Sequence, residues 1–285
     1  MAKNSEKLAR VGFTLASVIC VLLIILISAF LFSSGIKTLF KIGVKEFLFG
    51  LVWRPSNNEF GILPMIISSF ELTGIALLFG LPCGIFTSVF ISKYASVKAK
   101  RFFTSAVNLL AGIPSVVFGF FGIMIVVPAV RFIFGGNGTS MLSGSLILSI
   151  MILPTIISVS VPALDAVDRS YYECALALGA ESEDAIFKIM LPAAKNGITA
   201  AVVLAIGRAI GEATAVVMVA GNQPRLAKSI LQGVRTMTGN IIIEMGYAAD
   251  LHQEALICTG AILFLFIFII NFLIFRLRRK MEMSA

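Results

Sequence analysis

Two charged residues lie four positions apart in an otherwise apolar stretch, "VVLAIGRAIGEATAVVMVAG" at 202–221. On a single helix, Arg208 and Glu212 would share a face and could form an ion pair. Gly207 and Gly211 have the same spacing, and small residues at this spacing let a second helix approach closely. A central arginine or acid costs about 2.5–3.5 kcal/mol when a helix enters a bilayer. We therefore expect this face to meet protein or water rather than lipid.

The Arg208–Glu212 pair has two interpretations. It could be a structural ion pair that fixes the packing between subunits. Alternatively, Arg208 could transiently bind an anion on a transport pathway, with Glu212 holding the arginine and keeping the anion from binding too tightly to leave. Arginine suits an oxyanion because its planar guanidinium offers paired donors and stays protonated. The residues alone leave both interpretations open.

The composition predicts the helices that position these charges. Of the 285 residues, 58% are hydrophobic and 13% are charged, and the mean hydropathy is +0.99. Soluble domains carry about 25% charged residues, so the chain is expected to be an integral membrane protein. About 20 residues cross the hydrocarbon core as a helix. The apolar runs long enough to cross the membrane lie at 11–32, 72–92, within 102–130, within 132–164, 198–220 and 255–275. They predict an all-α membrane protein with six transmembrane helices.

Six spans place both termini on one side of the membrane. Lys and Arg are concentrated in the two termini and in the 93–101 and 163–197 loops, which predicts that all four are cytoplasmic. The segments at 33–65, which is also basic, and 222–255 would then be external, either folded over the outer mouth or meeting a partner. The predicted organisation is an N-terminal segment at 1–65 with the first span and an external part, a five-helix core at 66–275, and a basic tail at 276–285.

Motifs for catalysis and metal binding are absent from the sequence. Cys20, Cys83, Cys174 and Cys258 form no CxxC pair, and we expect His252 to be a solvated loop residue. There is no phosphate-binding P-loop and no nucleophile elbow. The sequence therefore predicts a transport component rather than an enzyme, with no cofactor, no metal and no nucleic-acid partner. Any energy for uphill transport must come from an ion gradient or another subunit.

The longest predicted cytoplasmic loop, 163–197, has the pattern of two short helices. Ser170 is positioned to cap the first helix, and Gly179 to end it in a left-handed conformation. Ser182 is positioned to cap the second helix, and Pro192 marks its end. The simplest interpretation is a helical hairpin that packs beneath the bundle.

Six residues of this loop have spacings that carry a more specific resemblance: Glu173, Ala175, Gly179, Ile189, Leu191 and Pro192. The arrangement resembles the E-A-A-x3-G-x9-I-x-L-P loop of ABC importer permeases, with Cys174 in place of alanine at the second position of the motif. In that family the loop forms a coupling helix that docks on an ATP-hydrolysing subunit. The resemblance therefore implies the type I, MetI-like permease architecture. It also implies that these six residues couple transport to ATP hydrolysis in the partner subunit.

Other segments resemble the phosphate importer permeases of the Pst system, of the PstC rather than the PstA type. They are "WRPSNNEFGILP" (53–64), "LLAGIPSVVFGFFG" (109–122), "AIGRAIGEATAVVMVAGN" (205–222) and "TGNIIIEMGYA" (238–248). This resemblance implies a multi-pass subunit of a bacterial inner membrane, surrounded by lipid, that passes inorganic phosphate along Arg208 and Glu212. Its implied partners are a PstA-like second permease, two PstB-like ATP-binding subunits and an extracytoplasmic PstS-like phosphate-binding protein.

Two alternatives remain from the sequence. The EAA loop would fit the permease of another oxyanion importer, for molybdate or sulfate, equally well. A secondary transporter or scaffold that acts without ATP is the other alternative, and the EAA loop argues against it.

Overall fold

The computed structural model describes residues 2–283, and the side chains of residues 10–276. Within this part of the chain, five helices are long and apolar enough to cross a membrane. A sixth crossing is present if two helices that meet at a 69° bend, Ser182–Ala193 and Lys195–Gly211, are counted as one. The predicted all-α membrane fold is confirmed, with five to six helices that are long and apolar enough to cross a membrane.

The centre of the molecule is the packing of α3 (Leu63–Val89) against α7 (Met141–Asp165), with α11 (Lys195–Gly211) alongside. Small residues allow the close approach. A Cβ on Gly80 or Gly84 would lie 2.7 Å from the side chain of Ile152 or Ile156. The buried cluster at this contact contains Leu72, Ala76, Leu148, Ile152, Ile156, Ala205, Ala209 and Val216. Alanine and glycine thus bring the helices together where leucine would hold them apart.

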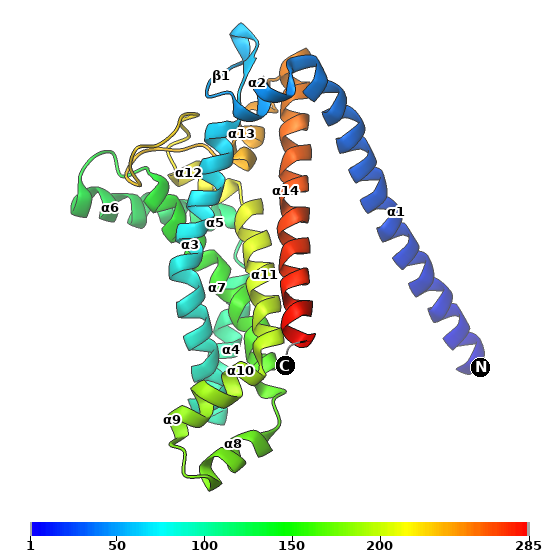
Figure 1. Cartoon of the computed structure of the whole chain (residues 1–285), viewed down its shortest axis with the longest axis vertical. Helices are drawn as coiled ribbons and strands as arrows, with labels where there is room; N and C mark the ends of the chain where they lie inside the picture. The colour runs from blue at the N-terminus through cyan, green and yellow to red at the C-terminus, as the bar shows by residue number, and fades with distance from the viewer. Residues whose placement is uncertain (1, 284–285) are drawn as a thin grey trace.

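The third predicted span, within 102–130, is not one helix. The chain forms α4 (Val97–Ala111), then α5 (Ser115–Phe121), the π-helical segment η3 (Gly122–Val126) and α6 (Val127–Phe134). Proline disfavours helical geometry in the residue before it, so Pro114 separates α4 from α5. Ser115–Phe134 is long enough to span by itself, but Figure 1 shows α6 projecting sideways from the bundle. Hydropathy alone missed this break.

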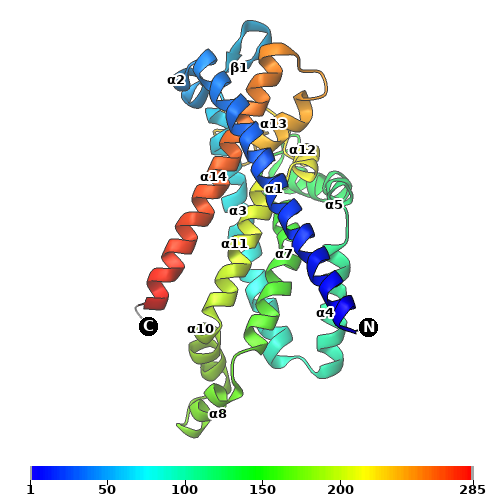
Figure 2. The same cartoon turned by 90° about the vertical axis from the view of Figure 1, so that its right-hand side faces the viewer.

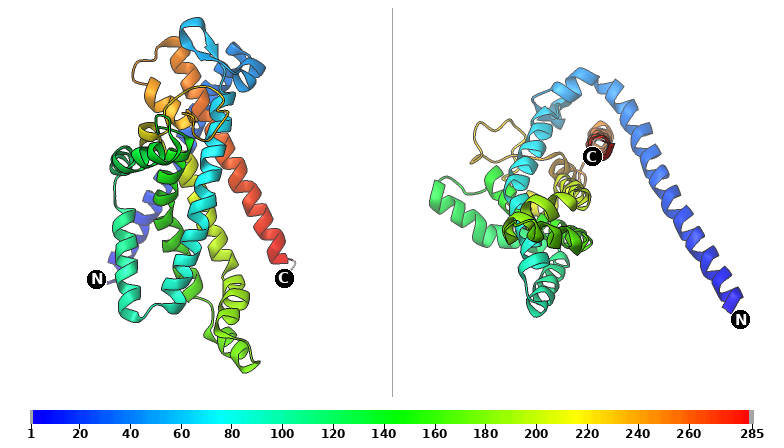
Figure 3. Two further views of the ribbon diagram at one scale, coloured as in Figure 1. Left: turned by 90° about the vertical axis from the view of Figure 1, so that its left-hand side faces the viewer. Right: turned by 60° about the horizontal axis from the view of Figure 1, so that its bottom comes forward.

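The first helix, α1 (Ala2–Ile42), is longer than the predicted span at 11–32. Near its C-terminal end it contacts the last helix, α14 (Asp250–Met283), where a Cβ on Gly35 would lie 2.8 Å from Ala261. Figures 1 and 3 show the N-terminal part of α1 diverging from the bundle. Both termini lie toward the same end of the molecule as the segment that contains α8 (Arg169–Ala177) (Figures 1 and 2), as the predicted topology requires.

The two predicted external segments fold against each other at the opposite end. The first contains α2 (Val44–Phe49) and an antiparallel hairpin of β1 (Trp53–Arg54) and β2 (Glu59–Phe60), joined by η1 (Pro55–Asn57). The second contains α13 (Met237–Glu244). Their shared core includes Phe47, Trp53, Phe60, Ile62, Met65, Met237 and Leu256. Of the two interpretations of these segments, the structure shows the folded cap; we call it the external cap.

Candidate functional site

The charged helix at 202–221 is broken between its two charges. The helix α11 ends at Gly211, and Glu212 has extended backbone angles of φ −72° and ψ 127°. A new helix, α12 (Thr214–Val219), begins two residues later. The expectation that Arg208 and Glu212 share one helix face is therefore wrong. Among the residues that the structure describes, no ion pair joins them.

Glu212 has a different partner. Its side-chain Oε1 accepts a hydrogen bond from the backbone N–H of Ala215 at 3.2 Å, so the carboxylate caps the first turn of α12. Its backbone carbonyl accepts a hydrogen bond from the hydroxyl of Thr238 at 3.1 Å. These contacts hold the break in place from both sides. The only local signal in the sequence was an acid directly after Gly211, a residue type that favours the end of a helix.

Arg208 lies on the outer face of α11. The side chain is exposed, and no hydrogen bond or ion pair of Arg208 occurs within the described part of the chain. Gly207 and Gly211 also have open space, because a Cβ on either would meet no atom within 4 Å. The opposite face of α11 is buried through Ala201, Ala205 and Ala209. The helix thus packs within this chain on its alanine face and leaves the glycine and arginine face open.

The external cap connects directly to this break. The helix α13 begins at a cap in which Thr236 accepts the N–H of Gly239 at 3.0 Å. The N–H of Met237 donates to the hydroxyl of Ser69 on α3 at 3.0 Å. Through Thr238, the same helix turn binds the carbonyl of Glu212. The position of the break is therefore tied to the cap and to the central helix α3.

A buried carboxylate organises the external cap. The side chain of Glu244 is 7% exposed and accepts hydrogen bonds from Trp53 Nε1 at 2.8 Å and from Arg235. Glu244 also contacts His252 Nε2 at 2.8 Å. Arg235 donates further to the side chain of Asn240, at 3.0 Å. One acid thus joins the hairpin, the segment before α13 and the start of α14.

The prediction for His252 is wrong. The residue lies in the first turns of α14 with a side chain only 15% exposed, not in a solvated loop. Its environment is made by distant residues, since Trp53 and Phe60 of the hairpin pack against its ring. The available signal was Glu244 itself, a lone acid in the apolar run "NIIIEM". An acid buried in such a run needs charged or hydrogen-bonding partners, and here these come from distant parts of the chain.

The predicted coupling loop forms two helices, as expected, with different caps. The first helix, α8, is capped by Asp168 rather than Ser170, and the N–H of Ser170 donates to Asp168 Oδ1 at 2.8 Å. This hydrogen bond lowers the pKa of the Asp168 carboxyl below its ordinary value. Gly179 ends the region with φ +87°, and Ala180 donates to the carbonyl of Ala175 at 3.1 Å. The predicted left-handed stop is confirmed.

The second helix of the loop consists of α9 (Ser182–Asp184), the π-helical segment η4 (Ala185–Met190) and α10 (Leu191–Ala193). Ser182 was expected to cap it, but Ser182 is its first residue, and its hydroxyl is 2.9 Å from the hydroxyl of Tyr172. This contact ties the two helices of the loop together. The helix continues one residue past Pro192 before the 69° bend into α11.

The six motif residues occupy different environments. Ala175 is buried, Ile189 and Leu191 are half-buried, and Glu173, Gly179 and Pro192 are exposed. Glu173 pairs with Arg169 at 2.9 Å on the surface of α8. Leu178, next to the terminating glycine, is 90% exposed. The loop therefore packs on the bundle through one side and presents an apolar tip to its surroundings.

The bundle and loop together have the architecture of an ABC importer permease. Residues 80–283 match the family described as binding-protein-dependent transport system inner membrane component. The chain belongs to this family. Members are transport components rather than enzymes, and they act with ATPase and binding-protein subunits.

Relatives from bacteria match over most of their length. The probable ABC transporter permease protein YqgH of Bacillus subtilis (strain 168) is 37% identical over 279 residues, which cover 94% of this chain and 90% of that protein. The phosphate transport system permease protein PstC of Mesorhizobium japonicum is 32% identical over 259 residues, with coverage of 84% and 78%.

Solved structures show the same fold. An amino acid ABC transporter with histidines is 20% identical, with a TM-score of 0.55 and coverage of 77% of this chain and 93% of that chain. The MetNI methionine ABC transporter in an inward facing conformation is also 20% identical, with a TM-score of 0.56 and coverage of 77% and 94%. At this level of identity, the likeness concerns the fold alone.

Proposed function

We propose that this chain is a transmembrane subunit of an ATP-driven phosphate importer in a bacterial inner membrane. The single observation that carries the proposal is Arg208, an exposed arginine on the otherwise apolar helix α11 beside the open positions of Gly207 and Gly211. A guanidinium in such a place is costly against lipid and well suited to an oxyanion. The similarity to a protein named as a phosphate transport permease supports phosphate as that oxyanion.

The proposed pathway lies between this chain and a second, PstA-like permease. The glycine face of α11 allows another helix to approach closely, and Arg208 would then face the interface instead of lipid. We retain Glu212 as a pathway residue, but its proposed role is to fix the helix break beside Arg208 rather than to pair with Arg208. Because Glu212 caps α12 and does not bind Arg208, the arginine stays available to a passing anion.

Two PstB-like ATP-binding subunits would bind the coupling loop and supply the energy for transport. A PstS-like binding protein would deliver phosphate at the external cap. The proposed coupling residues are Glu173, Ala175, Gly179, Ile189, Leu191 and Pro192. The buried members hold the loop to the bundle, and the exposed members and the apolar tip at Leu178 are available to the partner. Reorientation of the two permeases would then carry the anion past Arg208.

The substrate can be tested with the assembled complex in proteoliposomes. We expect ATP-dependent uptake of labelled phosphate that excess unlabelled phosphate suppresses and that excess sulfate or molybdate does not. Uptake of sulfate or molybdate in preference to phosphate would reject the substrate assignment. Phosphate uptake without any ATPase subunit would reject the importer mechanism.

The coupling assignment has its own test. Gly179→Asp places a charged side chain in the left-handed position, and Glu173→Arg reverses the charge of the exposed acid. Both variants should insert normally and lose ATP-driven uptake. Glu183→Gln, an exposed acid of the same loop outside the motif, is the matched control and should retain uptake. Normal uptake by both motif variants would contradict the assignment.

A further inference from the structure

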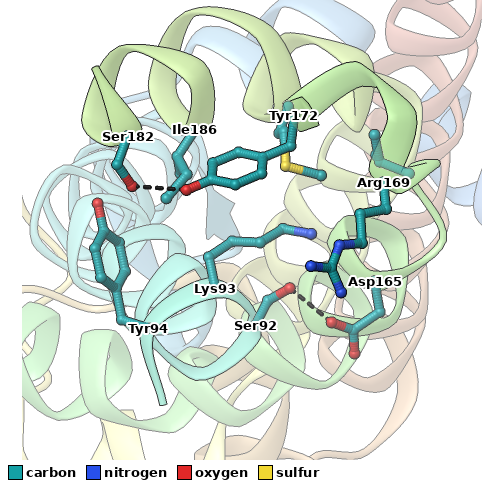
Figure 4. A pocket seen from close by; sticks show the side chains of 10 residues that line it. Ser92, Lys93, Tyr94, Asp165, Arg169, Tyr172, Ser182 and Ile186 are labelled. Atoms are coloured by element: carbon teal, nitrogen blue, oxygen red, sulfur yellow. Dashed lines mark hydrogen bonds between the residues drawn. The ribbon is translucent and has the colours of Figure 1, made fainter. Parts of the chain in front are cut away.

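A polar pocket of about 390 Å³ lies between the coupling loop and the cytoplasmic end of the bundle. One wall is the π-helical segment η2 (Phe90–Tyr94), which continues α3, together with the last turn of α7. The other wall is formed by α8 and η4 of the loop. Figure 4 shows the residues that line it. Neither the proposed pathway at Arg208 nor the coupling motif uses this space.

Two cations from opposite walls point into the pocket. Figure 4 shows the ammonium group of Lys93 and the guanidinium of Arg169 directed toward the same space. Lys93 Nζ donates to the carbonyl of Leu164 at 2.8 Å, and its other two donors have no partner within the described residues. Arg169 pairs with Glu173 through Nε, which leaves its two terminal nitrogens available.

The acid of the pocket is already occupied. Asp165 accepts hydrogen bonds from Lys100, at 2.7 Å to Oδ2, and from the hydroxyl of Ser92, at 2.7 Å to Oδ1. Two carboxylates, those of Asp165 and Glu173, thus face three cations: Lys93, Lys100 and Arg169. The hydroxyl of Tyr94 adds a further donor at the rim. The pocket has an excess of hydrogen-bond donors and of positive charge, which an anion with several acceptor oxygens would complement.

The position of the pocket narrows the chemistry of the ligand. It opens at the end of the bundle where α3 and α7 leave the predicted membrane region, a level that headgroups and cytosolic solutes both reach. Basic pockets between helices on the cytoplasmic side of membrane proteins bind phosphate-bearing headgroups. A phosphate group has the charge and the oxygen acceptors that Lys93 and Arg169 require, whether it belongs to a lipid or is free in solution.

We propose that this pocket binds a phosphate group and that the bound group fastens the coupling loop to α3 and α7. Lys93 holds it from the bundle and Arg169 from α8, so the ligand bridges the two walls. The loop packs on the bundle end through a buried apolar cluster of Val89, Leu164, Ile186 and Ala194, and its own ion pairs are exposed. The site is separate from Arg208, so phosphate binding here does not require that Arg208 lies on a transport pathway.

The experiment uses the full chain in lipid nanodiscs, in the Arg208→Gln background so that binding at α11 cannot contribute. Inorganic phosphate is titrated in nanodiscs of zwitterionic lipid, and the amide exchange of α8 is followed by mass spectrometry. A second series replaces part of the lipid with phosphatidylglycerol and adds no phosphate. We expect slower exchange of α8 amides in at least one series.

Variants decide whether the pocket is responsible. Lys93→Gln combined with Arg169→Gln should raise the ligand concentration needed for half-maximal protection of the α8 amides at least tenfold. Lys98→Gln combined with Lys188→Gln removes the same charge from exposed positions outside the pocket and should leave it unchanged. Glu173→Gln frees Arg169 and should not weaken binding.

The two series distinguish the sources of the phosphate group. Protection by inorganic phosphate in zwitterionic nanodiscs supports a free anion, and protection by phosphatidylglycerol alone supports a headgroup. Protection in neither series, or an equal loss in the Lys98 and Lys188 variant, would overturn the proposal.

Discussion

The two ends of the helix bundle use charged side chains in opposite ways. At the external end, the Glu244 carboxylate is 7% exposed and has Arg235, Trp53 and His252 as partners. At the cytoplasmic end, the Arg169–Glu173 pair lies on the surface, with side chains 85% and 62% exposed. The first set of charges holds together segments that are distant in sequence. The second joins residues one helical turn apart.

The difference indicates that the external end, unlike the cytoplasmic end, is stabilised mainly by buried contacts within this chain. Breaking a buried ion pair typically costs about 3–5 kcal/mol, whereas an exposed pair contributes about 0–1 kcal/mol. The external cap therefore has its own polar network and apolar core. The coupling loop exposes Leu178 and part of Phe187, which is 39% exposed. This is the end at which we propose that an ATPase subunit docks.

The largest expected effect is at the buried acid. Glu244→Ala leaves Arg235 buried without its carboxylate partner, and we expect a loss of about 3–5 kcal/mol in the free energy of unfolding of the external cap. Denaturant unfolding of the purified protein, followed through Trp53 fluorescence, measures it. Glu59→Gln, an exposed acid of the same cap, is the control. A loss below about 1 kcal/mol would remove the contrast between the two ends.

A smaller effect is expected for one donor to the same acid. Trp53→Phe keeps an aromatic ring in the core but removes the N–H that Glu244 accepts at 2.8 Å. A hydrogen bond to a charged group contributes about 1.5–3 kcal/mol, and we expect a loss in that range. Thermal unfolding with Phe60→Leu as a packing control separates the hydrogen bond from the lost ring contacts. An effect of Trp53→Phe no larger than that of a surface change would show that the N–H is dispensable.

At the cytoplasmic end, the backbone conformation of Gly179 is more important than the surface pairs. Gly179→Ala introduces a Cβ at φ +87°, which costs about 1–2 kcal/mol without any clash, because the space around it is open. We expect fraying at the C-terminal end of α8, measured by faster amide exchange at 177–180. Exchange equal to that of the unsubstituted protein would mean that the stop does not depend on glycine.

The exposed pair should contribute least. Glu173→Gln removes the partner of Arg169 on the surface of α8, and we expect a change of at most about 1 kcal/mol, decreasing with added salt. The measurement is thermal unfolding at low and high ionic strength. A salt-independent loss as large as that of Glu244→Ala would contradict the comparison between the two ends.

Acid should loosen the first turn of α8. The folded pKa of Asp168 lies below its unfolded value of 3.8, because the carboxylate accepts the N–H of Ser170. Its contribution is therefore complete above pH 3.8 and is lost as the pH falls through the lower folded pKa. Amide exchange of Ser170, corrected for intrinsic pH dependence, should report the loss. Asp168→Asn should remove this pH dependence, and a persistent dependence would contradict the assignment of the cap.

Local patterns predicted the parts of the structure that depend on local forces. Apolar runs predicted the helices, and Gly179 predicted the stop of the coupling loop, because span length and left-handed geometry act within a few residues. The break after Gly211 and the burial of His252 depend on Thr238 and Trp53, which are distant in sequence. The break at Pro114 had a local signal, but a scan for apolar length does not detect it. The proposed pathway lies between this chain and a second subunit, so the residues of this chain form only one side of it.

The central claim is that Arg208 handles the transported anion and does not serve as the partner of Glu212. The direct measurement is ATP-dependent uptake of labelled phosphate by the assembled complex with Arg208→Gln, and with the charge swap Arg208→Glu plus Glu212→Arg. Arg131→Gln, an exposed arginine on α6, is the matched control. We expect both Arg208 variants to assemble and to lose uptake, and the control to retain it. Uptake that survives Arg208→Gln, or that the charge swap restores, would contradict the account.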